Sequence, residues 1–328
     1  MKYAPADGFN ETKKDRQIEM EFDILHFYEF GAKLTYKVEY RTPLDEVIIN
    51  TIESKTFESI GKRFTKRNSF LARETLSEKG PYVYFIDSAN TAVLTLTSFH
   101  LDVDSFQVAL EDIFKNIKYK KTKNLIIDIR QNEGEYPVNA IKSFFYIANK
   151  PFKQQASSYV ITDILPEEQY SKNLVSWYTY EIFFEKYYQN SDKTVNGWES
   201  TIDENAPLMI PSKKKFKGKV YVLIGGKTFS AGSSFSLFSK NQGITLVGEE
   251  TGGGYYTQTG GYPIIYTLPN SEIKILIYFV KITRFTVDKT LKKGIGILPD
   301  EEVQLTVRDL IQGKDSQLDY VLKQIIND

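Results

Sequence analysis

Residues 220–234 read VYVLIGGKTFSAGSS, an apolar run that passes through two glycines into a segment of small residues. The unbroken apolar run predicts a strand that is buried on both faces, as in a parallel sheet. We predict that a helix follows this strand and that Ser230 lies at its start. Free backbone N–H groups and the positive end of the helix dipole at such a position can stabilise an alkoxide or a tetrahedral oxyanion. The local sequence also allows Ser230 to be an ordinary N-cap residue.

Similar strands and helices lie on both sides of this stretch. The predicted strands are residues 92–96, 125–129, 220–224 and 244–247, and the predicted helices are residues 104–117, 138–148, 230–239 and 315–326. This alternation predicts an α/β protein whose parallel sheet is covered by helices. Residues 262–287 alternate between apolar and polar side chains and predict antiparallel strands. Residues 150–215 show no regular pattern.

The first eighty residues differ in texture from the rest of the chain. Residues 1–80 are charged and uneven, and they predict a helix over 11–27, a strand over 34–40 and a further helix over 57–71. We therefore expect two parts, a smaller mixed α+β region at residues 1–80 and the main core at residues 81–328.

Composition excludes several classes of protein. The 328 residues are 41% hydrophobic and 26% charged, which is typical of a globular protein. Lys plus Arg and Asp plus Glu number 42 each, so the basic excess of most nucleic-acid-binding proteins is absent. The chain has no cysteine, which excludes thiol catalysis and cysteine-bound zinc, and its two histidines cannot form a three-histidine metal site. We expect no metal, no cofactor and no nucleic-acid partner. We also expect no membrane span, because no apolar stretch is long enough.

Two more glycine-containing turns follow predicted strands. Residues 128–135 read DIRQNEGE, and residues 248–256 read GEETGGGYY. Ligands of open α/β sheets bind beyond the carboxyl ends of the strands, so these turns are candidate sites. The first also fits an ordinary polar turn with an Arg–Asp pair, and the second lacks the G-x-x-x-x-G-K-[ST] motif of a phosphate-binding loop.

Taken in order, four stretches resemble the pattern of the S41 peptidases, the family of C-terminal processing proteases and the tricorn core. The matching stretches are DIRQNEGE at 128–135, TFSAGS at 228–233, LVGEETGG at 246–253 and GILPD at 296–300. The glycine-rich turn and residues 268–271 look most like exported members from Bacteroidota. The resemblance implies a ClpP/crotonase-like core of repeated ββα units and hydrolysis of peptide bonds by a serine nucleophile.

The resemblance also assigns roles to single residues. Ser230 falls on the nucleophile, and the backbone N–H groups of Ala231 and Gly134 fall on the oxyanion-hole donors. Gly252, Gly253 and Gly254, with Tyr255 and Tyr256, fall in the turn where we expect an extended peptide to bind along a strand edge.

The general base of the family has no match in this chain. Gly254 stands at the position where the family has its catalytic lysine. Lys227 stands at a different position of the motif, where we expect a solvated charge. Tricorn-like members use a histidine from an N-terminal motif that is also missing here. Of the two histidines, His26 lies in a predicted helix, and His100 lies in a loop and is the candidate base, although a surface role is favoured. We expect the general base to lie upstream of Met1 in a longer protein.

A further departure favours a second hypothesis. Glu135 replaces the second glycine of the first motif, and a carboxylate beside an oxyanion hole opposes negative charge there unless its side chain points away. The alternative function is therefore a non-catalytic module that binds peptides or lipophilic ligands on the same fold. The resemblance implies export to the periplasm or cell envelope, although the N-terminus shows no signal peptide.

Overall fold

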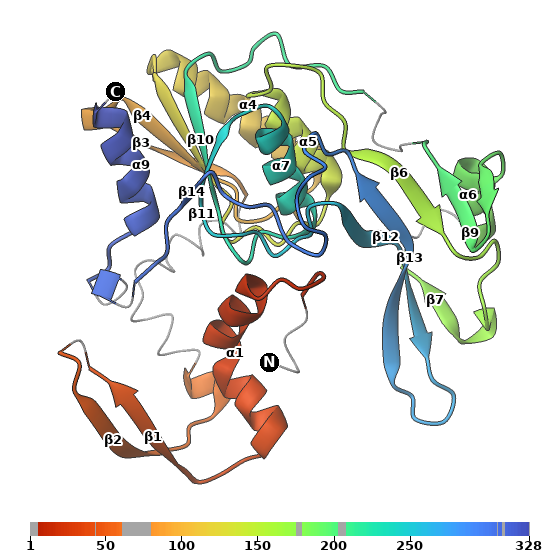
Figure 1. Ribbon diagram of the computed structural model, residues 1–328, viewed down its shortest axis with the longest axis horizontal. Helices are drawn as coiled ribbons and strands as arrows, with labels where there is room; N and C mark the ends of the chain where they lie inside the picture. The colour runs from red at the N-terminus through yellow and green to blue at the C-terminus, as the bar shows by residue number, and fades with distance from the viewer. Residues whose placement is uncertain are drawn as a thin grey trace.

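A six-stranded sheet forms the centre of the molecule (Figure 1). Its strands are β3 Tyr82–Ile86, β4 Thr91–Thr95, β5 Asn124–Asp128, β10 Lys219–Ile224, β11 Thr245–Gly248 and β14 Glu301–Glu302. Their order is β14-β11-β10-β5-β4-β3, and every pair is parallel except β3 with β4. The computed structural model describes residues 6–42, 44–60, 80–174, 179–202, 208–306, 308–309 and 312–327. The four strands predicted for the parallel sheet are confirmed.

Helices cover both faces of this sheet, as predicted. They are α4 Val103–Tyr119, α5 Pro137–Phe145 and α7 Ser230–Asn241 on one face, and α9 Ser316–Asn327 on the other (Figure 1). Successive strand residues point to opposite faces. Ile127 and Val222 therefore pack in the cluster with α4, α5 and α7, whereas Ile126 and Leu223 pack with Leu318 of α9. The predicted α/β class and the covered parallel sheet are confirmed.

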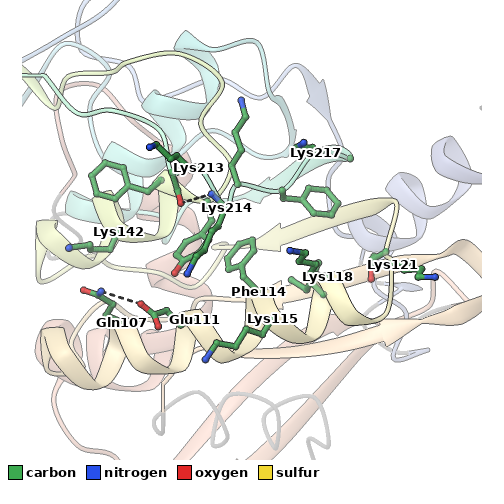
Figure 2. A pocket seen from close by; sticks show the side chains of 18 residues that line it. Gln107, Glu111, Phe114, Lys115, Lys118, Lys121, Lys142, Lys213, Lys214 and Lys217 are labelled. Carbon is green, nitrogen blue, oxygen red and sulfur yellow. Dashed lines mark hydrogen bonds between the residues drawn. The ribbon is translucent and has the colours of Figure 1, made fainter.

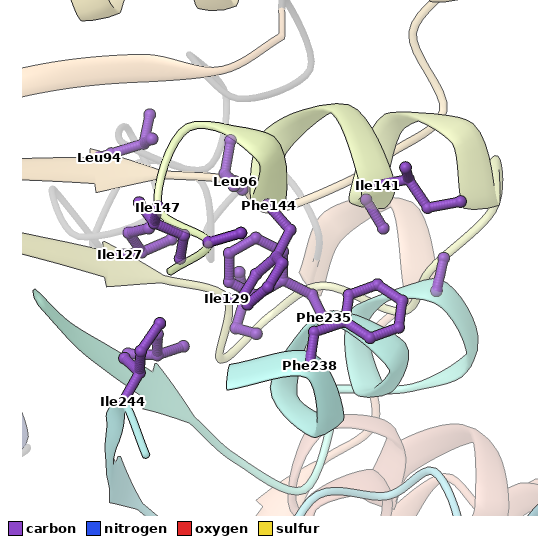
Figure 3. Packing of buried hydrophobic residues seen from close by; sticks show 14 of the residues in the cluster. Leu94, Leu96, Ile127, Ile129, Ile141, Phe144, Ile147, Phe235, Phe238 and Ile244 are labelled. Carbon is purple, nitrogen blue, oxygen red and sulfur yellow. The ribbon is translucent and has the colours of Figure 1, made fainter. Parts of the chain in front are cut away.

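Aromatic side chains join α5 to α7. The ring of Phe144 lies 5.5 Å from that of Phe235, 5.4 Å from that of Phe238 and 4.8 Å from that of Phe152, measured between centroids. Figure 3 shows Phe144 on α5 facing the two rings of α7, with Ile127 and Ile129 beside them. Buried rings in edge-to-face or tilted contact stabilise such a core. This packing holds α7, and with it Ser230, against the sheet.

A second six-stranded sheet extends from the core. It contains β6 Gln155–Val160, β7 Ser171–Asn173, β8 Asp192–Thr194, β9 Gly197–Ser200, β12 Thr257–Thr267 and β13 Lys274–Arg284, with α6 Tyr180–Tyr188 packed on it. The antiparallel pair predicted within residues 262–287 is confirmed by β12 and β13. Residues 150–215, whose sequence shows no regular pattern, contain four of these strands and α6. Their strands have only three to six residues, too few for a periodic pattern to emerge.

The N-terminal region contains α1 Thr12–Phe30 and a hairpin of β1 Thr35–Arg41 with β2 Val47–Glu53. The helix predicted over 57–71 is helical at residues 57–60, and the rest of it lies outside the described residues. No residue of α1 is buried. The division at residue 80 stays a prediction. Within the described ranges, no helix combines the length and the apolar character that crossing a bilayer requires.

Candidate active site

Ser230 occupies a sharp turn between β10 and α7. It is the first residue of α7 and has a φ of 45°, a left-handed conformation that few non-glycine residues adopt. The preceding residue, Phe229, is extended and takes the N-cap position, so the N-cap reading of Ser230 is wrong. Ser230 is half-buried, and its hydroxyl makes no hydrogen bond to any residue in the described part of the chain. The backbone therefore presents an unengaged hydroxyl at a helix N-terminus.

The first glycine turn lies directly against this serine. Gly134 has a φ of 115°, and a Cβ added there would lie 2.5 Å from Ser230 Cβ and 2.8 Å from the Ala231 nitrogen. Only glycine permits this approach without a shift of the serine. The Ala231 N–H, at the second position of α7, has no acceptor within its helix. The Gly134 N–H donates to Asn132 Oδ1 at 2.9 Å, so an oxyanion would compete with that side chain.

Asn132 connects the first turn to the second, a role that the sequence analysis missed. Its side chain is fully buried and donates to the Leu96 carbonyl at 2.7 Å, and its own carbonyl accepts the Phe229 N–H at 2.9 Å. Thr228 Oγ1 adds a hydrogen bond of 2.9 Å to the Ile129 carbonyl. A buried amide within a strand-end turn is the signal that predicts such a link, because buried polar groups need partners.

The glycine-rich third turn closes the other side of the site. Gly253 donates to the Thr228 carbonyl at 3.1 Å, and a Cβ on Gly253 would lie 2.2 Å from Ser233 Oγ. Tyr255 is 1% exposed, and its hydroxyl donates to the Asp288 carbonyl. The half-buried Tyr256 donates to a carbonyl in the same loop region. These rings support the turn, and their contact with a substrate stays a prediction, as does that of the three glycines.

A buried arginine, which the sequence analysis missed, binds the backbone of Ser230. Arg284, the last residue of β13, is 2% exposed. Its Nη2 donates to the Ser230 carbonyl at 3.2 Å and to the hydroxyls of Ser233 and Ser234 at 2.8 Å each. Its Nη1 donates to the Gly254 carbonyl at 2.6 Å. One guanidinium thus joins the start of α7 to the glycine-rich turn.

The charge of Arg284 is only partly balanced. Burial lowers the pKa of its guanidinium to about 10, against the opposing effect of the Asp7 carboxylate. Its Nε has no hydrogen-bond acceptor among the described residues. Arg284 lies on the same face of β13 as Val280 and Ile282, which are buried and half-buried. A cation in step with apolar residues of a strand is the signal that could have predicted it.

The N-terminal segment covers the outer rim of the three turns. Asp7 Oδ2 accepts the Gly254 N–H at 3.1 Å, and Asn10 donates to the Thr251 carbonyl at 2.6 Å. Arg16 forms two hydrogen bonds with Glu249, at 2.9 and 2.7 Å. Figure 1 shows the first turn of α1 below the loops at this end of the sheet. No local pattern of residues 7–16 predicts these contacts, which join residues more than 230 positions apart.

Burial raises the pKa of Asp7, although the Gly254 N–H and the charge of Arg284 act in the opposite direction.

Two lysines share the carboxylate of Glu133: Lys13 Nζ is 3.7 Å and Lys227 Nζ is 3.6 Å from its Oε1. The side chain of Lys227 is 21% exposed, so the charge expected to be solvated is part-exposed and shared with Glu133. Of these charged groups, Arg284 contacts Ser230 directly, whereas Asp7 bonds the neighbouring glycine-rich turn and the two lysines pair with Glu133 of the first turn.

Neither histidine contacts Ser230. His100 is exposed and stacks on Tyr136, with 5.8 Å between ring centroids, while His26 lies among the rings of α1. Within the described residues, no hydrogen bond joins either histidine to the serine. The catalytic role considered for His100 stays a prediction.

The carboxylate of Glu135 accepts hydrogen bonds from the segment that follows β4. Its Oε2 accepts the Ser98 hydroxyl and the Phe99 N–H, at 2.9 Å each. Its effect on an oxyanion at Ser230 stays a prediction.

The charged residues of the first and last motifs have structural partners. Arg130 Nη2 lies 2.6 Å from Asp128 Oδ2 and 2.7 Å from Asp315 Oδ2, which ties the first turn to the start of α9. The Arg–Asp pair considered for this turn is thus present. Asp300 pairs with Lys240 at 2.6 Å and accepts the Leu246 N–H at 2.9 Å. The first network holds the carboxyl end of β5 beside the site, whereas the second joins the start of β14 to the last turn of α7, ten residues beyond Ser230.

Comparison with known proteins supplies a family for this arrangement. The family described as Peptidase family S41 matches residues 90–303. No curated protein matches the chain. The structure of mature CPAF complexed with lactacystin is 15% identical, with a TM-score of 0.58, and the match covers 90% of this chain and 69% of that one.

A putative peptidase from Parabacteroides merdae ATCC 43184 is 16% identical, with a TM-score of 0.48 and coverage of 75% of this chain and 64% of that chain. A putative S41 protease from Bacteroides fragilis NCTC 9343 is 14% identical, with a TM-score of 0.47 and coverage of 89% and 66%. The chain thus spans somewhat less than two thirds of the length of the Parabacteroides protein. At these identities, the CPAF likeness establishes the fold alone.

Proposed function

This chain belongs to peptidase family S41, and we propose that it hydrolyses peptide bonds with Ser230 as the nucleophile. One observation carries the proposal: an unengaged serine hydroxyl lies at a helix start, on a left-handed residue, beside the Ala231 N–H and against Gly134. Left-handed non-glycine residues cost conformational energy and are concentrated at functional sites. A serine that served only to pack or cap would not need this backbone.

The reaction follows from the positions of these groups. The Ser230 oxygen attacks the carbonyl carbon of the scissile peptide while a base takes its proton. The carbonyl oxygen gains the negative charge, and the Ala231 N–H at the positive end of α7 donates to it. The amine leaves with a proton, and water then attacks the acyl-serine ester, which releases the acid and restores the hydroxyl. We assign Gly134 as the second donor, once the oxyanion replaces Asn132 as its acceptor.

The buried guanidinium of Arg284 supports the same step. It lies on the carbonyl side of Ser230 and carries no direct ion pair among the described residues. A positive charge in a buried site stabilises nearby negative charge more strongly than it would in water. We therefore assign Arg284 to positioning the serine and to lowering the energy of the tetrahedral anion.

The general base lies outside the residues that contact Ser230. Within the described part of the chain, no histidine, lysine or carboxylate forms a hydrogen bond with the serine hydroxyl. We propose that a residue beyond this sequence supplies the base. The substrate is a peptide or protein, and we place an extended segment of it along the turn at residues 252–256. Export to the cell envelope is part of the proposal and follows from the resemblance to Bacteroidota members.

A fluorophosphonate probe tests the nucleophile. The expected result is covalent labelling of the chain at Ser230 when imidazole supplies the missing base, which mass spectrometry of the labelled peptide locates, and no labelling of Ser230→Ala under the same conditions. Ser271→Ala is the matched control, because Ser271 is an exposed serine of the β12–β13 connection, and it should label like the wild type. Labelling of Ser230→Ala at the wild-type rate would contradict the assignment.

The binding-module hypothesis rests on two observations. The Gly134 N–H is occupied by Asn132, and the serine hydroxyl has no hydrogen-bonded base among the described residues. If a longer natural form of the protein also fails to react with the probe but binds peptides, the chain is a binding module on the peptidase fold.

A further inference from the structure

Two lysine-rich segments far apart in the sequence meet on the surface opposite Ser230. Residues 118–123 read KYKKTK and residues 213–219 read KKKFKGK, so nine of these thirteen residues are lysines and none is acidic. The Lys219 N–H donates to the Lys123 carbonyl at 3.0 Å, which brings the two segments together. We call these two segments, with Lys115 and Lys142, the lysine face.

The lysine face lies at the amino ends of two central strands. Residues 118–123 lead into β5, and residues 213–219 end at the first residue of β10, which pairs with β5 in parallel. Gly134 and Ser230 follow the carboxyl ends of the same two strands. Because the two strands are parallel, the lysines lie at one end of the strands, and Gly134 and Ser230 lie at the other end. The lysine face is therefore separate from the proposed active site.

Its centre is a groove of about 960 Å³ between α4, α5 and residues 212–218. Figure 2 shows the lysine side chains placed around this groove, with Phe114 in its floor. Glu111 is the one carboxylate among the residues that line it. Lys115 pairs with Asp112, whereas no ion pair between described residues involves Lys118, Lys121 or Lys214. A chain with no net charge thus concentrates unbalanced positive charge in one place.

The residue types favour an array of phosphates over a protein partner. All the cations lining the groove are lysines. Lysine is depleted in protein interfaces, where arginine is enriched, and it acts as a point charge without the planar fork that recognises a carboxylate. Lysine clusters instead attract anionic lipid headgroups, and the attraction grows with each added lysine.

The aromatic residues distinguish a bilayer from a nucleic acid. Phe114 is 7% exposed and stacks on Tyr146 at 4.2 Å between centroids, so this pair offers bases little free ring surface. Tyr119, between Lys118 and Lys120, is 86% exposed. An exposed tyrosine flanked by lysines suits the interface of a membrane, where the ring lies at the level of the headgroups. We propose that the lysine face docks the protein on a bilayer that contains anionic phospholipids.

Sedimentation of the full chain with vesicles tests this docking. We expect binding to vesicles of phosphatidylcholine mixed with phosphatidylglycerol, weakening as salt is added, and no binding to phosphatidylcholine alone. The variant with Lys118, Lys121, Lys214 and Lys217 all changed to Gln should lose about a hundredfold or more in partitioning. A matched variant with Lys37, Lys172, Lys274 and Lys289 changed to Gln removes the same charge from exposed positions elsewhere and should bind like the wild type.

Two further measurements keep the test decisive. Tyr119→Ser keeps every charge, and we expect it to weaken vesicle binding several-fold at all salt concentrations. Thermal unfolding shows whether each variant is folded. The proposal is overturned if the two quadruple variants bind alike, or if neutral vesicles bind as well as anionic ones. It is also overturned if a single-stranded oligonucleotide binds more tightly than the anionic vesicles and displaces them, since the ligand would then be a nucleic acid.

Discussion

The Nη2 atom of Arg284 lies 3.2 Å from the carbonyl oxygen of Ser230, so a buried cation holds the backbone of the proposed nucleophile. The same guanidinium bonds the Gly254 carbonyl and two serine hydroxyls of α7. Because β13 supplies the arginine and β10 leads to the serine, the second sheet helps to determine the conformation of the turn that follows a strand of the first.

Arg284→Lys should slow the reaction of Ser230 with a fluorophosphonate. Lysine keeps the charge but cannot make the four hydrogen bonds of the guanidinium at once. Hydrogen bonds to charged groups contribute about 1.5–3 kcal/mol each, so we expect labelling by a fluorophosphonate to slow by about tenfold or more. Arg41→Lys is the control, since Arg41 is exposed in β1. Wild-type labelling by Arg284→Lys would exclude the positioning role.

Gly134→Ala should move Ser230. The new Cβ would lie 2.5 Å from Ser230 Cβ on a residue with a φ of 115°. Overpacking and left-handed strain together predict a loss of about 2 kcal/mol or more in the free energy of unfolding, and labelling of the serine should fall with it. Gly260→Ala is the matched control, because nothing lies within 4 Å of a Cβ added there. Urea unfolding compares the stabilities of Gly134→Ala and Gly260→Ala. Equal stabilities would show that the first turn accommodates a Cβ at residue 134 without cost.

Imidazole should accelerate the reaction of Ser230 if the base is missing. The serine hydroxyl has no hydrogen-bonded base among the described residues, and a small base can approach it from solvent because the residue is half-buried. We expect the hydrolysis of a p-nitrophenyl ester to rise by about tenfold, a part of the 10²–10⁴-fold that a positioned base contributes. Ser230→Ala measures the direct reaction of imidazole with the ester. An equal rise in both proteins would show that the base is already in place or that the serine is inert.

As the pH rises, the Asp7→Asn variant should gain stability relative to the wild type. Burial raises the pKa of Asp7 above 3.8 in the folded protein, so the folded state holds this proton more tightly than the unfolded state. Protonated Asp7 therefore contributes to the free energy of unfolding of the wild type. This contribution is fully present below pH 3.8 and is lost as the pH rises through the raised pKa. Asparagine does not ionise and can still accept the Gly254 N–H.

Urea unfolding of Asp7→Asn and the wild type at several pH values between 4 and 7 measures this difference. A wild type that gains stability over the variant as the pH rises would instead show that attraction to Arg284 outweighs the burial of Asp7.

The amino-acid sequence predicts the parts that depend on neighbouring residues. The apolar run at residues 220–224 and the small residues after it specify a buried strand and the start of a helix, because both depend on short-range periodicity. The glycines at 134 and 253 mark places where the backbone approaches another segment closely. The strands at residues 155–200 were missed, because three to six residues are too few to show a period.

Only the tertiary structure determined which distant residues share the site. Asp7 reaches the glycine-rich turn from the N-terminal segment and Arg284 reaches it from the end of β13. The lysines at 118–123 meet those at 213–219 at the start of two paired strands. No local pattern encodes these contacts, because the order of strands in the sheet and the docking of the N-terminal segment decide them. Sequence thus determined the helix start at which Ser230 lies, whereas packing determined the charges around it.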